Sequence, residues 1–435
     1  MARADRWRLA AGGAVAVAVV ASCGAASSPF EPAFAAIPLY SEGVVLDASG
    51  HPELVLVGDT ASSHPAQQAR QDAWLAEGTV PGPERYAPLA EQALRDLDAL
   101  VLPGGAAVAA ASPGWRYVWP RDASFTAVAL ARTGHTDDAH EILTYLRDMQ
   151  AERSTDGVFE ARYLPDGQGD VPDDRGPQLD GNGWVLWAVA EWYAAAEPGR
   201  ARTAGLEELR PLVERSLAAI ADHVDAESGL PGVFPDYWEV HERVPTLGTA
   251  APLLAGVRAS DDVVAALDLE PTDDLEALLA RGVEQFAPAY PRRLGGQQQD
   301  TAVAFLMPPF APADPEVTAA WQAASASMVR PAGGLAPGAG WKRDGVSWTP
   351  TTAVFGLTAA ASGDVAAATA TLDWLDAHRT AEGALPEKVL WDGSPSAVAP
   401  LAWTASLVLL TLDELDRQDG GAGGGVSVGV GGGAG

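Results

Sequence analysis

Residues 123–151 read ASFTAVALARTGHTDDAHEILTYLRDMQA, and this stretch decides the fold of the chain. Its first nine residues carry no charge, whereas residues 136–151 place Ile142, Leu146 and Met149 at spacings of four and three among charged side chains. That spacing predicts an amphipathic helix with one face in water. The uncharged segment before it predicts a helix that is covered on all sides.

The same alternation of a charged amphipathic segment with an uncharged one occurs six times along the chain. The pairs are 85–100 with 121–133, 136–151 with 182–196, 201–225 with 247–258, 272–287 with 299–307, 314–328 with 349–361, and 364–379 with 400–414. Helices that alternate between a wet and a dry environment are what two concentric rings require. The sequence therefore predicts an all-α fold, an (α/α)6 barrel with six outer and six inner helices, of which the fourth inner helix has the weakest pattern.

A short β-hairpin is expected before the barrel, because Val44-Val45-Leu46 and Leu54-Val55-Leu56-Val57 flank a turn at Ser49-Gly50. The predicted organisation is a signal peptide over residues 1–22, a tether with the hairpin over 23–84, the (α/α)6 domain over 85–417, and a glycine-rich tail over 418–435. The tail cannot bury enough side-chain surface to order itself.

The N-terminus has the pattern of a sorting segment. Arg3, Arg6 and Arg8 precede an uncharged stretch, Leu9 to Ala21, which is shorter than the roughly 20 residues that span a bilayer. Cys23, the sole cysteine, stands at the position that resembles the lipidation site of a bacterial lipoprotein signal. The alternative is an ordinary secretion signal cut after Ala33-Phe34-Ala35. Either signal exports the chain, to the outer face of the cell membrane as a lipoprotein or as a secreted protein.

Composition excludes several classes of function. The chain has 28 basic and 58 acidic side chains and a net charge of -30, which excludes binding to nucleic acid or to an anionic membrane surface. One cysteine excludes a disulfide framework and a cysteine-based zinc site. We expect a monomer that meets a membrane only through the lipid anchor.

The lengths of the connections indicate where a functional site lies. Passages from an inner helix to the next outer one are mostly short, whereas those from outer to inner are long: 101–120, 152–181, 226–246, 329–348 and 380–399. In such a ring the long passages emerge at one end and can form a cup. Six tryptophans lie in them: Trp115, Trp119, Trp238, Trp341, Trp348 and Trp391. Aromatic faces suit the apolar faces of sugar rings.

Two loop glutamates are candidates for the chemistry. Cleavage of a glycosidic bond needs a carboxylic acid that protonates the departing oxygen and a carboxylate that activates water or attacks the sugar. Glu239 follows a proline and an indole in 234–238 (FPDYW), surroundings that would raise its pKa and suit a general acid. Glu387 precedes Lys388, a cation that favours the charged form and suits a base. Taken alone, each glutamate is more often a solvated surface group.

Two helix starts have two interpretations each. In 115–123 (WRYVWPRDA), Asp122 either only favours the positive end of a helix, or it binds sugar hydroxyls together with Arg121 while Trp119 or Tyr117 packs against the ring. The segment 176–183 (GPQLDGNG), which contains Asp180, can be interpreted in the same two ways.

Together these segments resemble glycoside hydrolase family 15, the glucoamylase-like group. Five motifs occur in the order seen in that family: 117–123 (YVWPRDA), 178–181 (QLDG), 238–239 (WE), 385–387 (LPE) and 400–403 (PLAW). The resemblance covers residues 85–415 and implies a six-hairpin α/α barrel. It also implies an exo-acting, anomer-inverting enzyme that releases glucose from the non-reducing ends of α-linked glucosides.

The resemblance makes Glu239 the general acid and Glu387 the general base. It assigns substrate binding to Trp119, Arg121, Asp122, Asp180, Trp238 and Trp403. An inverting hydrolase needs no cofactor, and it separates its two carboxyl groups by about 6.5–9.5 Å to admit water. The sequence departs from the family pattern at Lys388, where the family usually has glutamine, so the choice of substrate stays open.

Other interpretations remain beside this one. The same machinery serves a trehalase or an α-1,6-glucan glucohydrolase, and a glycan-binding lipoprotein that lost turnover keeps the cup without the chemistry. Four aspartates of one loop, Asp166, Asp170, Asp173 and Asp174, either hold calcium or only form turns. We favour the turns and predict no metal site.

Overall fold

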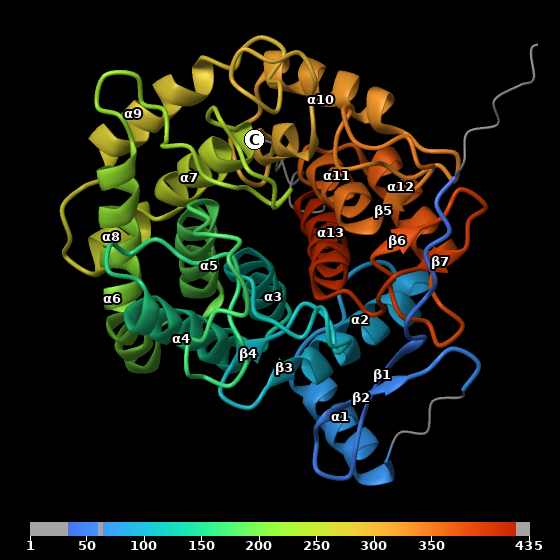
Figure 1. The fold of residues 1–435 in the computed structure, drawn as a ribbon. Coiled ribbons are helices and arrows are strands. Elements are labelled where there is room, and N and C mark those ends of the chain that lie inside the picture. The colour runs from blue at the N-terminus through green and yellow to red at the C-terminus, as the bar shows by residue number, and fades with distance from the viewer. Residues whose placement is uncertain (1–33, 60–63, 423–435) are drawn as a thin grey trace, which may run out of the picture. The chain divides into compact units, whose positions relative to one another are not determined.

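In a computed structural model, residues 34–59 and 64–422 are described, and six helices form a closed inner ring (Figure 1). They are α3 (Pro120–Arg132), α5 (Asp180–Ala195), α7 (Leu247–Ala259), η2 (Thr301–Leu306), α11 (Thr349–Ala361) and α13 (Ala402–Ala422). Each packs against the next, and α13 packs against α3. All twelve residues from Pro120 to Ala131 of α3 are buried, as the uncharged stretch 123–131 predicts for its own part of the helix.

Six further helices lie outside this ring. They are α2 (Ala87–Leu100), α4 (Thr136–Arg153), α6 (Arg200–His223), α9 (Asp273–Glu284), α10 (Pro315–Met328) and α12 (Val365–Ala377). In α4 the buried side chains include Ile142, Leu146 and Met149, and the charged ones face outward. The two rings predicted from charge alternation are therefore present.

Three helical segments differ from the prediction. The fourth inner helix, η2, is a single 3₁₀ segment, because Pro308 and Pro309 follow it directly. A short helix, α8 (Asp261–Ala266), follows α7. Helix α1 (Pro65–Glu77) packs on α2, although the sequence predicts helices only from residue 85. It has no fully buried residue, so it lacks a clear apolar stripe.

The strands are short and antiparallel. The expected hairpin is β1 (Gly43–Leu46) with β2 (Pro52–Val55), paired from Gly43 opposite Val55 to Leu46 opposite Pro52. A second pair is β3 (Val101–Leu102) with β4 (Ala106–Ala107). A three-stranded sheet has the order β5 (Ser347–Trp348), β6 (Lys388–Val389), β7 (Pro395–Ser396). The last two sheets stiffen the long connections between outer and inner helices.

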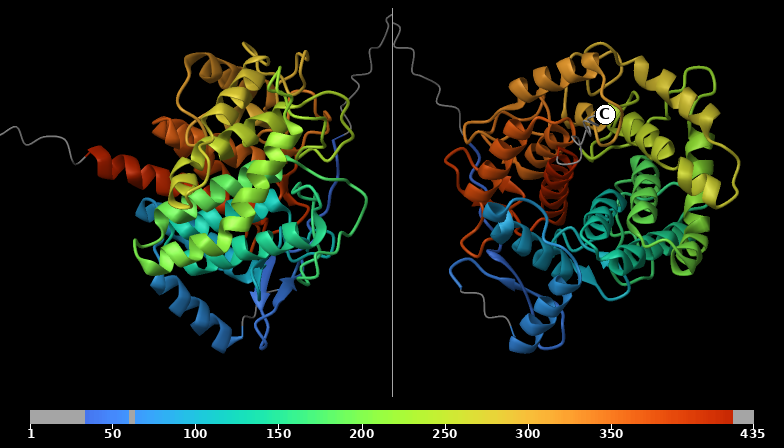
Figure 2. Two further views of the ribbon diagram at one scale, coloured as in Figure 1. Left: turned by 90° about the vertical axis from the view of Figure 1, so that its left-hand side faces the viewer. Right: turned by 180° about the vertical axis from the view of Figure 1, so that it is seen from behind.

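These long connections gather at one end of the barrel, and the carboxyl end of α13 projects from the other (Figure 2). Aromatic side chains fill the axis between the helices. Phe125 lies 4.9 Å from Trp184, 4.8 Å from Trp187 and 5.7 Å from Trp403, measured between ring centroids. In the part of the chain that the structure describes, no helix is both long and apolar enough to cross a bilayer.

Candidate active site

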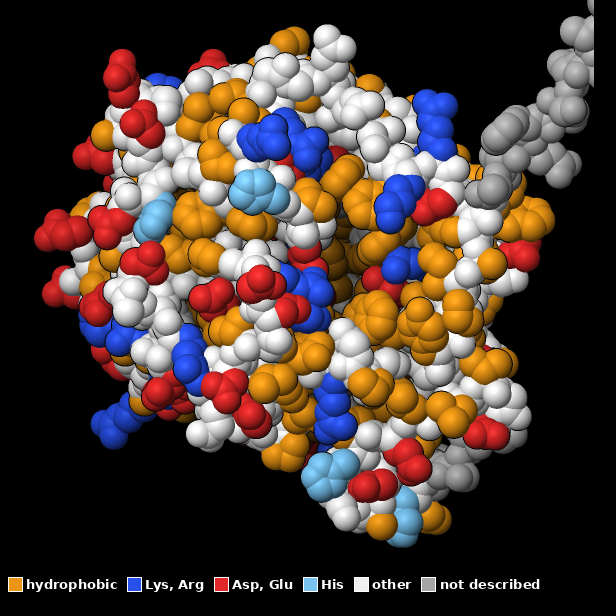
Figure 3. All heavy atoms as spheres, in the orientation of Figure 1, with side chains coloured by type: hydrophobic (Ala, Val, Ile, Leu, Met, Phe, Trp, Pro, Cys, Tyr) orange, Lys and Arg blue, Asp and Glu red, His pale blue; other side chains and the backbone are white. Residues whose placement is uncertain are grey.

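A cavity of about 510 Å³ opens at the loop end of the barrel. Figure 3 shows it as a hollow with hydrophobic side chains around it and basic side chains at its rim. Its walls come from all five long connections and from the first residues of inner helices. The lining includes Trp115, Trp119, Trp238, Trp341, Trp348 and Trp403.

The structure brings most of the sequence-predicted residues to this cavity. Glu239, Glu387, Trp119, Arg121, Asp122, Trp238 and Trp403 all line it. Asp180 differs, because it lies buried behind the Arg121 guanidinium instead of in the wall. Trp391 lies away from the cavity, half exposed and stacked on Phe34. Cys23 lies outside the described residues.

Glu387 lies in a buried position at the start of β6. Its backbone N–H donates to the Val398 carbonyl and its carbonyl accepts from the Thr349 N–H, at 2.8 and 3.0 Å, so the loop is held on two sides. Burial raises the pKa of Glu387, and Lys388 together with a hydrogen bond from Trp115 opposes part of that rise. The expected effect of Lys388, which lowers the pKa of Glu387, is thus confirmed, but the sequence did not show the burial that outweighs it.

Glu239 closes a tight turn over 236–239. Its N–H donates to the Asp236 carbonyl at 2.7 Å, and its φ of 53° is uncommon for a residue other than glycine. Backbone strain of this kind concentrates at functional sites. The indole of Trp119 donates to Glu239 Oε1 at 2.6 Å, and the guanidinium of Arg175 contacts Oε2. The carboxyl group therefore has polar partners, whereas the sequence led us to expect apolar surroundings.

Arg121 is the centre of a buried polar cluster in the cavity wall. Its Nη1 lies 3.3 Å from oxygens of Gln178 and Asp180, and its Nη2 lies 3.3 Å from Asp122 Oδ2. The guanidinium also lies over the Trp403 ring, 5.2 Å from its centroid. Burial raises the pKa of Asp122, and it raises that of Asp180 to about 6 although Arg121 opposes the shift. Both helix starts are confirmed, at Pro120 and Asp180, and Arg121 and Asp122 of the first one line the cavity, whereas the binding of sugar hydroxyls stays a prediction.

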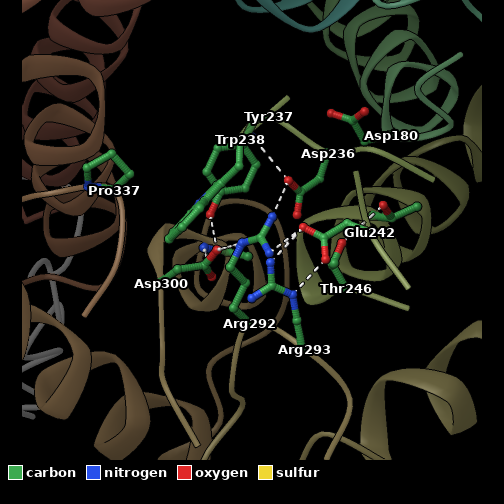
Figure 4. Close-up of polar contacts among 12 residues, drawn as sticks. Asp180, Asp236, Tyr237, Trp238, Glu242, Thr246, Arg292, Arg293, Asp300 and Pro337 are labelled. Atoms are coloured by element: carbon green, nitrogen blue, oxygen red, sulfur yellow. Dashed lines mark hydrogen bonds and ion pairs between the residues drawn. The ribbon is translucent and has the colours of Figure 1, made fainter. Parts of the chain in front are cut away.

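Next to Trp238 lies a network of polar contacts centred on Arg292 (Figure 4). Arg292 Nη2 and Nη1 each lie 2.6 Å from a carboxylate oxygen, of Asp236 and Glu242 respectively, and Nε lies 3.3 Å from Asp300. Its guanidinium packs on the Trp238 ring, 4.1 Å from the centroid. Burial raises the pKa of Asp300 to about 7. Although burial favours neutral Glu242, Arg293 and Arg292 hold its pKa below the usual value.

Sequence reasoning missed several residues of the site. Arg162 and Arg175 line the cavity and both pair with Asp173, so this aspartate of the suspected calcium loop serves two arginines. Within residues 34–59 and 64–422, no group of three or more His, Cys, Asp or Glu side chains is arranged to hold a metal ion. Arg162 packs over Tyr117 and Trp119 at 4.1 and 4.9 Å. In the sequence, the tryptophans of these loops indicated that a cavity lies here, but no pattern pointed to Arg162 or Arg175.

Comparison with known proteins gives the following likenesses. No family model matches the chain. The isomaltose glucohydrolase of Kribbella flavida is 27% identical over 341 residues, which are 69% of this chain and 84% of that protein. A solved glycosidase structure is 23% identical with a TM-score of 0.63 and covers 82% of this chain and 99% of its own. A bacterial glucoamylase complexed with acarbose is 15% identical, with a TM-score of 0.63, over 79% of this chain and 58% of its own.

The architecture is thus the (α/α)6 barrel of glucoamylases, as predicted from the alternation of charged and uncharged helices. The chain has the fold of glucoamylase-like domains, and the resemblance carried by its five motifs is confirmed at the level of the fold.

Proposed function

We propose that this chain is an exo-acting, anomer-inverting glycoside hydrolase that releases glucose from the non-reducing ends of α-linked glucosides. The observation that carries the proposal is that Glu239 and Glu387, which come from two different long connections, line one tryptophan-walled cavity. Its volume is that of a small-ligand pocket, which is typically about 300–1,000 Å³. The homologous glucohydrolase and the neighbouring glycosidases support the same reaction class.

In the proposed reaction, Arg121 and Asp122 bind hydroxyls of the terminal sugar while Trp403 packs against its ring. A water molecule attacks the anomeric carbon as the bond to the glycosidic oxygen breaks. Glu387 takes the proton from this water, and protonated Glu239 gives its proton to the departing oxygen. The products are β-glucose and the rest of the saccharide, shortened by one residue. The proton on Glu387 then returns to Glu239 through solvent.

For the linkage, we propose α-1,6 glucosides such as isomaltose as the first substrates. The support is the name of the 27% identical relative, an isomaltose glucohydrolase. Maltooligosaccharides and trehalose are the alternatives, and glycan binding without turnover is a further one.

Proton NMR of the released sugar tests this function. Isomaltose, maltooligosaccharides and trehalose are each incubated with the purified domain, and prompt β-glucose is expected from isomaltose. Prompt α-glucose would exclude inversion, and binding of all three sugars without product would favour the glycan-binding protein.

The roles of the two glutamates are tested by substitution. Glu239→Gln and Glu387→Gln should each lower kcat by about 10²-fold or more, because general acid–base catalysis contributes roughly 10²–10⁴-fold. Glu227→Gln, in the same connection as Glu239 but exposed, is the matched control. Full activity in either active-site variant would contradict its role.

We further propose that the chain is exported, acylated at Cys23 and monomeric. The support for export and acylation is the N-terminal signal pattern. Labelling of expressing cells with a palmitate analogue should mark the wild type and not Cys23→Ser. Light scattering of the domain that begins at residue 34 should give the mass of one chain.

A further inference from the structure

Two lysines are unusual among the 28 basic residues of this chain, because all the others are arginines. Lys388 lines the cavity and Lys342 does not, although each lies over an indole of the cavity wall. Lys342 Nζ lies 5.8 Å from the Trp341 ring centroid, and Lys388 Nζ lies 4.2 Å from that of Trp348. An ammonium over an indole face is attracted by the ring quadrupole.

The sheet fixes the place of the Lys388 side chain. In the register of β5 and β6, Lys388 pairs directly with Trp348, so the cation–π contact is a cross-strand pair. The same ammonium lies 3.1 Å from Glu387 Oε2. Both side chains are largely buried, with 14% and 9% of their surfaces exposed, so the contact is only weakly screened by solvent.

The other groups that face Glu387 do not provide a second cation. Asp122, at the start of α3, acts on Glu387 as a like charge. Arg121 contacts Asp122 and Asp180. Trp115, in the connection 101–119, supplies a neutral hydrogen bond. Within the described part of the chain, Lys388 is the only cation in an ion pair with Glu387.

We propose that Lys388 is a positioning residue for the general base: its ammonium, held over Trp348, keeps the Glu387 carboxylate ionised and fixes its orientation in the cavity. This inference rests on the proposed function. Glutamine, the residue usual at this position in the family that the sequence resembles, could donate a hydrogen bond but carries no charge. The charge of the lysine keeps Glu387 ionised at lower pH, and so extends the activity of the base in that direction. The direction agrees with the effect of Lys388 on the pKa of Glu387.

The test is the pH dependence of kcat/KM for Lys388→Gln and Lys388→Arg. In Lys388→Gln the acidic limb should move up by about one pH unit, a tenfold loss on that limb with the plateau retained, because one pKa unit is a tenfold change in ionisation. Lys388→Arg should restore the wild-type limb. Lys342→Gln, which removes the lysine without a carboxylate partner, should leave the limb in place. A Lys388→Gln profile that falls equally at every pH would show a merely structural role and overturn the proposal.

The scarcity of lysine offers a second, chemical test. In the Lys342→Gln background, Lys388 is the sole lysine, so acetylation removes its charge selectively while reductive dimethylation retains it. In acetylated protein the acidic limb of the kcat/KM profile should move to higher pH, and in dimethylated protein it should not. The double variant Lys342→Gln/Lys388→Gln, modified in the same two ways, measures the effect of modifying the terminal amine alone. Equal profiles for the two modified proteins would overturn the proposal.

A readout without turnover separates this inference from the proposed function. The Glu387 side-chain carboxyl can be titrated by ¹³C NMR in labelled protein, with its signal assigned by its loss in Glu387→Gln. Its midpoint should rise by about one unit in Lys388→Gln, and an unchanged midpoint would overturn the role of Lys388. If wild-type protein cleaves no α-glucoside, the proposed function fails while this titration still decides the inference.

Discussion

The indole of Trp119 is the side chain through which the cavity wall acts on Glu239. It donates to Oε1 at 2.6 Å and would stabilise the carboxylate that forms as Glu239 gives up its proton, and a hydrogen bond to a charged group contributes about 1.5–3 kcal/mol. Trp119→Phe keeps a ring in the wall but removes the donor. We therefore expect kcat to fall by roughly tenfold or more while KM changes little, as measured by steady-state kinetics on the best substrate.

Trp341→Phe is the matched comparison for this prediction. Trp341 lines the same cavity, but its indole N–H has no hydrogen-bond partner. Its replacement should therefore affect kcat less than Trp119→Phe does. The opposite order would mean that ring size, and not the hydrogen bond, matters at residue 119.

Arg292 stabilises the turn that carries Glu239, because it forms an ion pair with Asp236 of that turn. It contacts Asp236, Glu242 and Asp300, so Arg292→Met leaves the buried carboxyl groups of Asp236 and Asp300 without their cation and leaves Glu242 with Arg293 alone. Breaking a buried ion pair costs about 3–5 kcal/mol. We expect a loss of unfolding free energy of about this size, measured by urea denaturation, together with a lower kcat.

Arg293→Met provides the contrast for Arg292. The Arg293 side chain is 46% exposed and pairs with Glu242 alone, so its removal should cost about 1 kcal/mol or less. Equal losses in the two variants would contradict the central place of Arg292.

Individual residues also show the limit of what the sequence could predict. Glu239, Glu387, Trp119 and Arg121 could be assigned to the site because they lie in recognisable loop motifs. Arg175, by contrast, is distant in the chain from Glu239, and nothing local marks it as a partner. The effect of burial on Glu387 was hidden for the same reason, since its sequence neighbours show Lys388 but not the surrounding walls.

Helices were predictable where one pattern runs over several turns. Helix α3, with its uncharged stretch 123–131, and the amphipathic α4 each follow from a single local stretch. The 3₁₀ segment η2 gave only a weak pattern because it lasts six residues. Helix α1 was missed because its contact is made by single side chains: Trp74 stacks on His135 at 3.7 Å and its indole donates to Asp138.

The contact between α5 and α7 depends on two glycines of the inner ring. A Cβ added at Gly183 would lie 2.2 Å from the Pro252 carbonyl oxygen, and one added at Gly256 would lie 2.1 Å from that of Gly183. Backbone atoms cannot give way as a side chain can, so Gly183→Ala and Gly256→Ala force the helices apart. We expect each to lower the unfolding free energy by about 1–3 kcal/mol, measured by chemical denaturation.

Gly43→Ala is the control for these two substitutions. The Cβ added there meets only side-chain atoms at 3.5 and 3.9 Å, which is ordinary contact. It should change the stability of the protein little. If the two inner-ring variants were equally well tolerated, the α5–α7 distance would not be set by the missing side chains.

For the molecule as a whole, the buried acids make stability depend on pH. Burial raises the pKa of Asp96 to about 8, that of Asp300 to about 7 and that of Asp180 to about 6. Between the pKa of such a group in the unfolded chain, near 4, and its value in the folded protein, the folded state binds more protons. Stability therefore falls as pH rises through this window, by up to about 1.4 kcal/mol per pH unit and group. As the pH decreases below about 4, stability also decreases, because ion-paired carboxylates such as Glu242 become protonated.

Among these three groups, Asp96 extends the window furthest into alkaline pH. Its Oδ1 accepts from Gln92 at 2.9 Å and its Oδ2 has no partner, so an amide fits in place of the protonated acid. Asp96→Asn should unfold at a higher temperature than wild type at pH 8.5, where wild type must either hold a buried charge or bind a proton, and at the same temperature at pH 5. Scans in 0.5 M NaCl screen the repulsion of the acidic surface, which acts in the same direction. The exposed Asp222→Asn removes the same charge without burial and should show no alkaline gain. A gain of equal size at pH 5 and pH 8.5 in Asp96→Asn would mean that packing, and not ionisation, limits stability at this position.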